Sequence, residues 1–198
     1  YFEHISTTDF KTWTEHEAAT PIEEQWETFG TGTPFVWDGK LCVSYGLHTS
    51  RIYPDEKTMY PALKVYYENY GKTGHFDYTS FPTVPSGATY SVSQDGVTDF
   101  KKSKKIIHYS ENPTIYTDAD GKLTMIASFR SKGMWQSDSL DGSWYCVNKD
   151  FPPGGDCTFH FRWGNFDYII GGFTDLWSKP ISATNTEYTS VVKSGEYF

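Results

Sequence analysis

The chain has 198 residues, enough for one domain with a substantial core, and its 25 acidic residues outnumber its 17 Lys and Arg to give a net charge of −8. This charge argues against nucleic acid as a main partner, because basic residues supply most of the affinity for a phosphate backbone. No stretch approaches the roughly 20 consecutive apolar residues of a membrane span, so a membrane is not expected as a partner either. A neutral or small-molecule ligand fits this composition better.

The three cysteines, Cys42, Cys146 and Cys157, are too few and too scattered to form a disulfide framework, although one disulfide remains open. We interpret them as small buried apolar residues. No Cys-x-x-Cys pair indicates zinc, and we expect neither a metal nor a cofactor. The sequence begins at Tyr1 without a methionine and inside what looks like a repeat. We therefore expect the chain to be part of a longer protein.

The predicted elements are β-hairpins in which β-branched and aromatic residues alternate around a tight turn, and no convincing amphipathic helix is present. One kind of hairpin starts with Ser, carries Asp near its turn and closes on an aromatic residue. The other kind joins two apolar strands through Asp-Gly or Gly-Asn. In chain order they are STTDFKTW (6–13), TPFVWDGKLCVSYG (33–46), SVSQDGVTDF (91–100), NPTIYTDADGKLTMIAS (112–128), SDSLDGSW (137–144) and CTFHFRWGNFDYIIGG (157–172).

The alternation of the two kinds gives four strands per unit at a spacing of about 45 residues, which predicts an all-β fold of β-propeller blades with four antiparallel strands each. We expect the outer end of one blade, two full blades and about half of another, so that the propeller is incomplete in this chain. Residues 52–86 form a long Tyr-rich insertion in the first full unit. The alternative fold is an all-β sandwich.

The blade pattern separates turn-forming carboxylates from candidate catalytic ones. If the strands are lettered A to D from the central channel outward, the A–B and C–D turns lie on one face of the disc, the turn face. The A strands begin on the opposite face, the start face. Five aspartates fall in turns, where Asp tolerates and caps the tight backbone, so that we expect a structural role for them: Asp38, Asp95, Asp118, Asp120 and Asp141.

Glu111 lies elsewhere, just before an A strand on the start face, where Pro113 favours an extended backbone at Asn112. We expect the equivalent place to hold Asp156 one blade later and the GTGTP stretch with Thr33 one blade earlier. Because neighbouring A strands converge near the axis, Glu111 and Asp156 are predicted to face one cavity. Two carboxylates in one pocket can reach different pKa values, one serving as acid and one as base. The alternative is that Glu111 only caps local backbone amides.

The B–C loops open on the start face and supply polar, cationic and aromatic side chains. This combination suits a sugar, because aromatic rings stack on its C–H surfaces and charged groups bind its hydroxyls. Each residue alone is as readily explained by packing. The 52–86 insertion either walls this cleft or packs on a neighbouring domain. The candidate substrate-binding residues are Thr33, His48, Arg51, Arg130, Trp135, Trp177 and, inside a predicted A strand, His160.

At these residues the sequence resembles the five-bladed β-propeller glycoside hydrolases of families 43 and 32. STTDFKTW is similar to their recurring Ser-x-Asp-hydrophobic-x-x-Trp blade motif, and TGTPFVWDGKLCVSYG is similar to their Gly-Lys strand pair. ENPTIYTDADGKLTMIASF resembles the segment that carries their general acid just before an A strand. The resemblance covers most of the chain except 52–86 and implies that 1–198 belongs to a single propeller catalytic domain.

In these families a Glu is the general acid, an Asp of the first blade is the base or nucleophile, and another Asp tunes the acid. The resemblance therefore implies a glycosidase with a carbohydrate substrate, Glu111 as general acid, and an extracellular or periplasmic location. The first-blade Asp has no match here, and Asp156 is the candidate substitute for the tuning Asp. Two alternatives stay open: a carbohydrate-binding propeller without catalysis, and a glycoside phosphorylase that holds phosphate with His48, Arg51 or Arg130.

Overall fold

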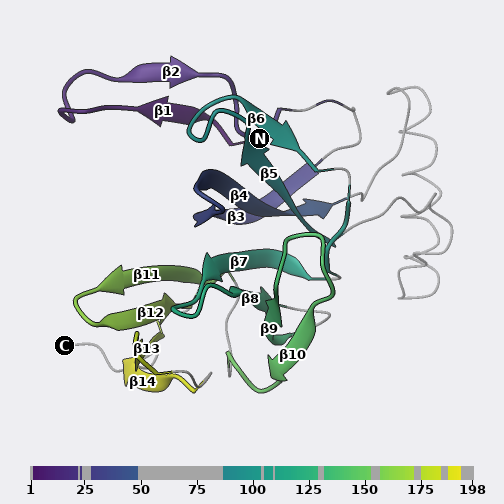
Figure 1. Cartoon of the computed structure of the whole chain (residues 1–198), viewed down its shortest axis with the longest axis vertical. Coiled ribbons are helices and arrows are strands. Elements are labelled where there is room, and N and C mark those ends of the chain that lie inside the picture. Colours follow the sequence, from purple (N-terminus) through teal and green to yellow (C-terminus); the bar gives the residue numbers. More distant parts are fainter. Residues whose placement is uncertain are drawn as a thin grey trace, which may run out of the picture.

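The computed structural model describes residues 2–21, 23, 28–48, 87–103, 105–108, 110–128, 132–152, 157–171, 175–183 and 187–192. The regular elements in these ranges are all β-strands (Figure 1). Within the same ranges, no helix is long and apolar enough to span a membrane. The 52–86 insertion lies outside the described residues, and its place beside the cleft stays a prediction.

The described strands form one hairpin and three four-stranded antiparallel sheets, each made of strands that follow one another along the chain. The hairpin pairs β1 (His4–Ser6) with β2 (Thr14–His16). The first sheet contains β3 (Thr28–Trp37), β4 (Lys40–His48), β5 (Gly87–Ser93) and β6 (Phe100–Lys102). The second contains β7 (Glu111–Thr117), β8 (Leu123–Ser128), β9 (Gly133–Ser137) and β10 (Tyr145–Asn148). The third contains β11 (Phe159–Trp163), β12 (Phe166–Ile170), β13 (Leu176–Pro180) and β14 (Thr189–Val192).

The all-β fold built from four-stranded units is confirmed, and one detail of the strand count is wrong. The sequence predicts about half a blade for the last unit, whereas β13 and β14 complete it. The stretch after the third apolar hairpin carries no Ser-x-Asp turn like that of SVSQDGVTDF. The sequence therefore marks the outer hairpins of the first and second sheets, but it does not mark the β13–β14 hairpin of the third sheet.

The innermost strands β3, β7 and β11 lie side by side and run in the same direction, as predicted. Near their starts, the hydroxyls of Thr114 and Thr158 are 2.8 Å apart. Near their ends, Thr117 Oγ1 donates to the carbonyl of Val36 at 2.8 Å, and Arg162 Nη2 donates to the carbonyl of Thr117 at 2.8 Å. These contacts join β7 to β11 at both ends and β3 to β7 near their ends.

The turns of the inner hairpins follow from their glycines. Asp38 and Gly39 both have positive φ, 49° and 70°, between the paired residues Trp37 and Lys40. This is the two-residue type I′ turn that Asp-Gly favours. The second inner hairpin has a longer connection, in which Gly121 (φ 81°) donates its N–H to the carbonyl of Asp118 at 3.0 Å. Both sites are turns, as predicted.

Two of the Ser-led hairpins share a second turn design, in which one Asp carboxylate accepts backbone bonds, and a third hairpin has a variant of it. Asp9 Oδ1 accepts backbone N–H bonds from the residues two and three positions later, at 2.8 Å each. Asp95 Oδ1 accepts the same two bonds at 3.0 and 2.6 Å. In the third example Ser139 replaces the Asp, and Ser137 Oγ donates to its carbonyl at 2.8 Å. The structural role predicted for the turn carboxylate Asp95 is confirmed.

Hydrophobic side chains fill the space between successive sheets. Tyr90 and Met125 belong to a cluster between the first and second sheets, and Ile126 and Trp177 belong to one between the second and third. Met125 and Ile126 are neighbours on β8 and point to opposite faces, so this strand contributes to both cores. Full burial of side chains of this size stabilises the fold by roughly 1.5–3 kcal/mol each.

The three cysteines are free thiols in three different environments. Cys42 is fully buried, and burial raises the pKa of its thiol to about 11, so that it stays protonated. Cys157 is partly buried. Cys146 is exposed on β10, where the expectation of burial is wrong, because its strand is the outermost of its sheet and has one open side.

Candidate functional site

The start face contains two unusual backbone positions in successive blades. Asn112 and Cys157 have φ values of 49° and 55°, a left-handed conformation that is uncommon outside glycine. Asn112 directly follows Glu111 and Cys157 directly follows Asp156. The expectation that Pro113 keeps Asn112 extended is wrong, because the chain bends here as it enters the inner strand.

Thr31 of β3 contacts the start of both following inner strands. Its backbone N–H donates to Asn112 Oδ1 at 3.0 Å, and its hydroxyl lies 3.4 Å from Cys157 Sγ. Ser44 of β4 also donates to the carbonyl of Pro113 at 3.0 Å. The residues that follow the two candidate acids therefore both contact one residue, Thr31, at the start face.

The strand register identifies the position in the first sheet that matches Glu111. In the second sheet, Glu111 pairs with Ser128, and a bulge follows before the pairing resumes. In the first sheet, Phe29 pairs with Leu47 and the same kind of bulge follows. Phe29, rather than Thr33, thus corresponds to Glu111, so the expected equivalence of Thr33 is wrong and the first sheet offers no carboxylate there.

Three candidate sugar-binding residues, Thr33, Trp135 and Trp177, pack inside the blades. Thr33 is 4% exposed, and its hydroxyl is 3.1 Å from that of Ser44. Trp135 packs partly buried against the core between the first and second sheets, with its ring centroid 4.4 Å from that of His108. Trp177, in turn, is buried at 4% exposure within the next core cluster. Packing explains the positions of these residues, and a role in sugar binding stays a prediction for all three.

The side chains of the other start-face candidates lie outside the described part of the chain. Glu111 is placed as the first residue of β7 and His48 as the last residue of β4, but their side chains are outside the described part of the chain. Arg51, Arg130 and Asp156 lie outside the described residues altogether. The predicted carboxylate pair therefore stays a prediction, supported by the backbone at 112 and 157.

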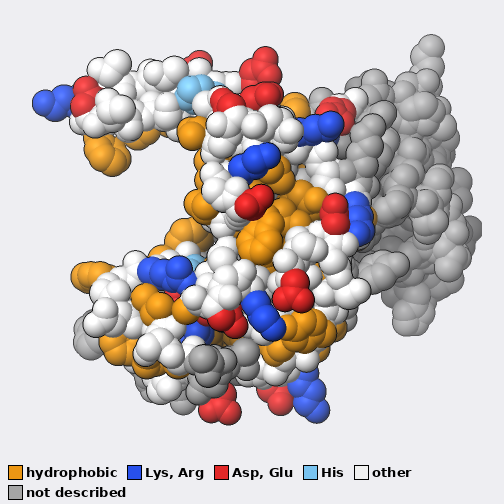
Figure 2. Space-filling view, viewed as in Figure 1, with side chains coloured by type: hydrophobic (Ala, Val, Ile, Leu, Met, Phe, Trp, Pro, Cys, Tyr) orange, Lys and Arg blue, Asp and Glu red, His pale blue; other side chains and the backbone are white. Residues whose placement is uncertain are grey.

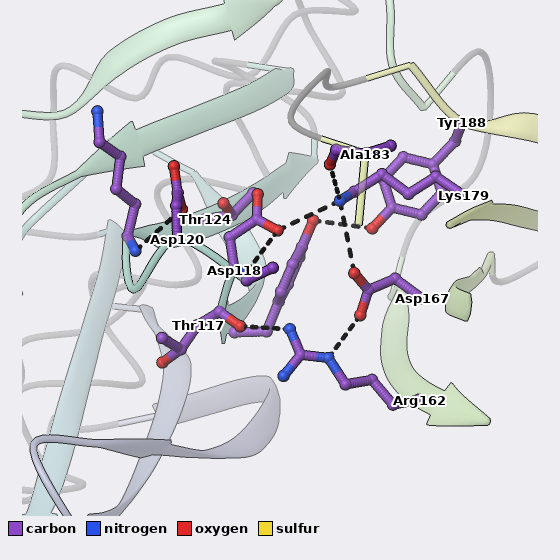
Figure 3. A network of polar contacts seen from close by, with 12 residues as sticks. Thr117, Asp118, Asp120, Thr124, Arg162, Asp167, Lys179, Ala183 and Tyr188 are labelled. Atoms are coloured by element: carbon purple, nitrogen blue, oxygen red, sulfur yellow. Dashed lines mark hydrogen bonds and ion pairs between the residues drawn. The ribbon is translucent and has the colours of Figure 1, made fainter. Parts of the chain in front are cut away.

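A buried ion cluster between the second and third sheets was missed by sequence reasoning (Figure 3). Asp167 of β12 is 0% exposed, and its Oδ1 accepts from Arg162 Nε at 2.7 Å and lies 2.9 Å from His160 Nε2. Its Oδ2 has no well-aligned hydrogen bond but lies 3.4 Å from Lys179 Nζ. Lys179 is 2% exposed and also pairs with Asp118 Oδ1 at 3.2 Å. Asp118, predicted only as a turn former, thus also joins two blades.

The surroundings of the cluster keep the Asp167 carboxylate charged and the two nearby phenols neutral. Burial alone would raise the pKa of Asp167, but hydrogen bonds from His160 and Arg162 outweigh burial and lower it to about 2. The His160 ring stacks on Tyr116 at a centroid distance of 3.8 Å, and the Tyr116 hydroxyl is 2.9 Å from that of Tyr188. Burial raises the pKa of both phenols above its usual range, so both stay neutral.

One sequence signal could have revealed the cluster. In NFDYII, Asp167 stands between aromatic residues on a strand, at a position that alternation directs to the buried face. A carboxylate at such a position needs a buried cation as partner. Lys179, in LWSKP, pairs with Asp167 across the β12–β13 register. The contacts of His160 with Asp167 and Tyr116 fit the alternative of a satisfied core histidine, and its predicted channel position stays a prediction.

No protein-family model matches the sequence, and no curated protein matches it. Solved structures do match. Zg3597, a family 117 glycoside hydrolase of the marine bacterium Zobellia galactanivorans, aligns with a TM-score of 0.55 and 15% identity over 96% of this chain and 55% of that one. The GH32 β-fructofuranosidase BmSUC1 of Bombyx mori aligns with a TM-score of 0.54 and 14% identity over 96% of this chain and 41% of that one.

A third match comes from the GH130 family of mannoside phosphorylases, described as containing glycoside hydrolases that target β-1,2-mannosidic linkages in Candida mannan. Its TM-score is 0.50 and its identity 14%, over 98% of this chain and 60% of that one. The chain therefore spans between 41% and 60% of the length of these solved chains. At such low identity the likeness establishes the fold alone. The described hairpin and sheets are blades of the β-propeller that these glycoside hydrolases share.

Proposed function

We propose that this chain forms part of a glycoside hydrolase that cleaves a glycosidic bond in an oligo- or polysaccharide with paired carboxylates. One observation carries the proposal. Thr31 contacts both Asn112 and Cys157, the residues that directly follow Glu111 and Asp156. The contacts of one residue with both of these side chains support a shared site for the two acids, and the fold likeness to glycoside hydrolases supports it by analogy.

In this mechanism Glu111 is the general acid that protonates the leaving glycosidic oxygen. Cleavage then passes through an oxocarbenium-like transition state, and the second carboxylate either activates water or attacks the sugar. Glu111 must hold its proton near neutral pH, which burial or a neighbouring carboxylate such as Asp156 would achieve by raising its pKa. Asp156 is the candidate for the second carboxylate within this chain.

The proposal is tested with Glu111→Gln in the complete protein, assayed on a panel of aryl glycosides and oligosaccharides. The variant keeps the side-chain shape but cannot donate the proton, so turnover of unactivated substrates should fall by about 10²–10⁴-fold. Substrates with a dinitrophenyl leaving group need little protonation and should lose much less. Asp120→Asn is the matched control, because Asp120 lies exposed in a turn on the opposite face, and it should leave turnover nearly unchanged.

Two results would contradict this assignment. Equal losses on activated and unactivated substrates would remove Glu111 from the acid role, and full activity in the variant would return Glu111 to backbone capping. The likeness to a GH130 protein also favours a second candidate, a glycoside phosphorylase. Turnover that requires inorganic phosphate would identify it, and sugar binding without any turnover would identify a non-catalytic propeller.

A further inference from the structure

A pocket lies at the opposite end of the inner strands from the candidate acids. It has a volume of about 450 Å³ and is bounded by residues 34–38, which end β3 and begin its turn, by the end of β7 and by β11. Thr31 and Val36 are five residues apart on β3, which corresponds to about 16 Å at a rise of about 3.3 Å per residue. A ligand in this pocket would therefore be separate from the Glu111 position.

The pocket has the composition of a small-molecule site. Such sites are mostly apolar, have volumes of about 300–1,000 Å³ and contain a few fixed polar groups. Here Val36 and Trp37 supply apolar surface, and Asp38, His160 and Arg162 supply the polar groups. In Figure 2 the described molecule is hollowed between the β1–β2 and β11–β12 hairpins, and orange hydrophobic atoms border the hollow.

The polar groups are held in place by the buried ion cluster behind them. Arg162 donates Nε to Asp167 and Nη2 to the carbonyl of Thr117, and no described protein group accepts from its Nη1. The His160 ring is held between Asp167 and the face of Tyr116. The pocket thus offers preorganised donors, which bind a ligand without a large loss of side-chain freedom.

The charge balance determines the class of ligand. The positive charges of Lys179 and Arg162 are matched by the negative charges of Asp118 and Asp167 in the same chain of ion pairs. The His160 ring also faces Asp167, with its Nε2 2.9 Å from Oδ1. A strongly anionic ligand would therefore find no uncompensated cation, and exposed Asp38 at the rim would repel it. A neutral molecule with both hydroxyl groups and a C–H face matches the donors, the Asp38 acceptor and the apolar wall.

We infer that this turn-face pocket is a second binding site, which takes a neutral sugar residue. The sugar hydroxyls accept from Arg162 Nη1 and donate to the Asp38 carboxylate, while its C–H face lies on the exposed side chain of Val36. Because the pocket is about 16 Å along the strand from the start-face contacts, it binds without taking part in bond cleavage. The inference is independent of the proposed catalytic role of Glu111.

The site is tested by NMR titration of the complete protein with neutral monosaccharides, including glucose, mannose, galactose, xylose and arabinose. The pocket reporters are the Gly39 amide and the Arg162 Nε–H signal, and the Thr31 amide reports the start face. Val36→Arg should fill the pocket and weaken binding at least about tenfold. Its matched control is Val191→Arg, because Val36 and Val191 are 59% and 52% exposed and Val191 lies on β14, which does not line the pocket.

Two further variants keep the test independent of the fold and of catalysis. Asp38→Asn keeps the turn, because Asn tolerates positive φ, and should weaken binding several-fold. Glu111→Gln should leave the shifts at Gly39 and Arg162 unchanged. The inference is overturned if no neutral sugar moves the pocket signals, if Val36→Arg binds as tightly as Val191→Arg, or if only charged sugars such as glucuronate bind. Shifts confined to Thr31 would overturn it as well.

Discussion

At the scale of single residues, Asn112 and Cys157 have a left-handed backbone where the chain enters the inner strands on the start face. A non-glycine residue in the left-handed region costs roughly 1–2 kcal/mol, so surrounding contacts must hold it there. For both residues these contacts include Thr31. The strain is therefore concentrated directly after the two candidate acids, where the backbone direction decides how the preceding side chains project.

Substitution of Asn112 separates the strain from the side-chain contact. Asn112→Gly removes the acceptor for the Thr31 N–H, but glycine adopts the positive φ without strain. Asn112→Ala removes the same acceptor and also strains the backbone. We expect the Ala variant to be less stable than the Gly variant by about 1 kcal/mol, measured by urea unfolding. Equal stabilities would show that the backbone at Asn112 is not strained in the way described.

His108 is expected to weaken the fold in acid. Burial lowers the pKa of His108 to about 4, its Nδ1 is buried without a hydrogen bond, and its ring lies against Trp135. Because this pKa lies below the ordinary value of 6.5, the unfolded chain binds the proton more readily, and the free energy of unfolding should fall as the pH falls from about 6.5 to 4.

The variant His108→Phe keeps a ring against Trp135 and removes the titrating group. Its free energy of unfolding should fall less than that of the wild type over this interval, by about 1–2 kcal/mol after allowance for solvent screening of the partly exposed ring. Urea unfolding at several pH values measures the difference. Parallel pH curves for the two proteins would contradict the expectation.

At the scale of elements, the ion cluster joins the second and third sheets through one buried ammonium group. Lys179 lies between Asp118 and Asp167, so Lys179→Met would leave both carboxylates without their shared cation. Loss of one partner of a buried pair typically costs about 3–5 kcal/mol. We expect this loss in urea unfolding, while exposed Lys149→Met should change stability by less than about 0.5 kcal/mol. A loss of similar size in both variants would contradict a specific role for the cluster.

The elements also show what local sequence can predict. The turns at Asp38-Gly39 and around Asp95 follow from the backbone that these residues favour, so their sequence is enough to locate them. The partnership of Asp118 with Lys179 depends on contact between residues 61 positions apart, which no local pattern encodes. The same limit applies to the bulge that matches Phe29 with Glu111, because a bulge depends on how two strands pair.

At the scale of the whole molecule, the third sheet has one buried face, which includes the ion cluster, and a second face that is apolar and exposed. One face, with Asp167 and Ile169, is buried against the second sheet. The register places a second set of residues on the other face: Phe159 with Ile170, Phe161 with Tyr168, and Trp163 with Phe166. A sheet with one solvated face normally alternates apolar with polar residues. This second face is therefore suited to burial, as the two sides of β8 are.

We expect the open face of the third sheet to be covered in the complete protein by another apolar surface, such as a further blade or domain. Trp163 is 74% exposed in the described structure. If it is covered, Trp163→Gln should destabilise the complete protein by about 3 kcal/mol or more, as truncation of buried aromatic residues does.

Phe10→Gln is the matched control, because Phe10 also lies near the tip of a hairpin and is 83% exposed. It should change stability by less than about 0.5 kcal/mol. Small and equal effects of the two substitutions on urea unfolding would show that this face stays in water, and that the aromatic residues of β11 and β12 stabilise only one another.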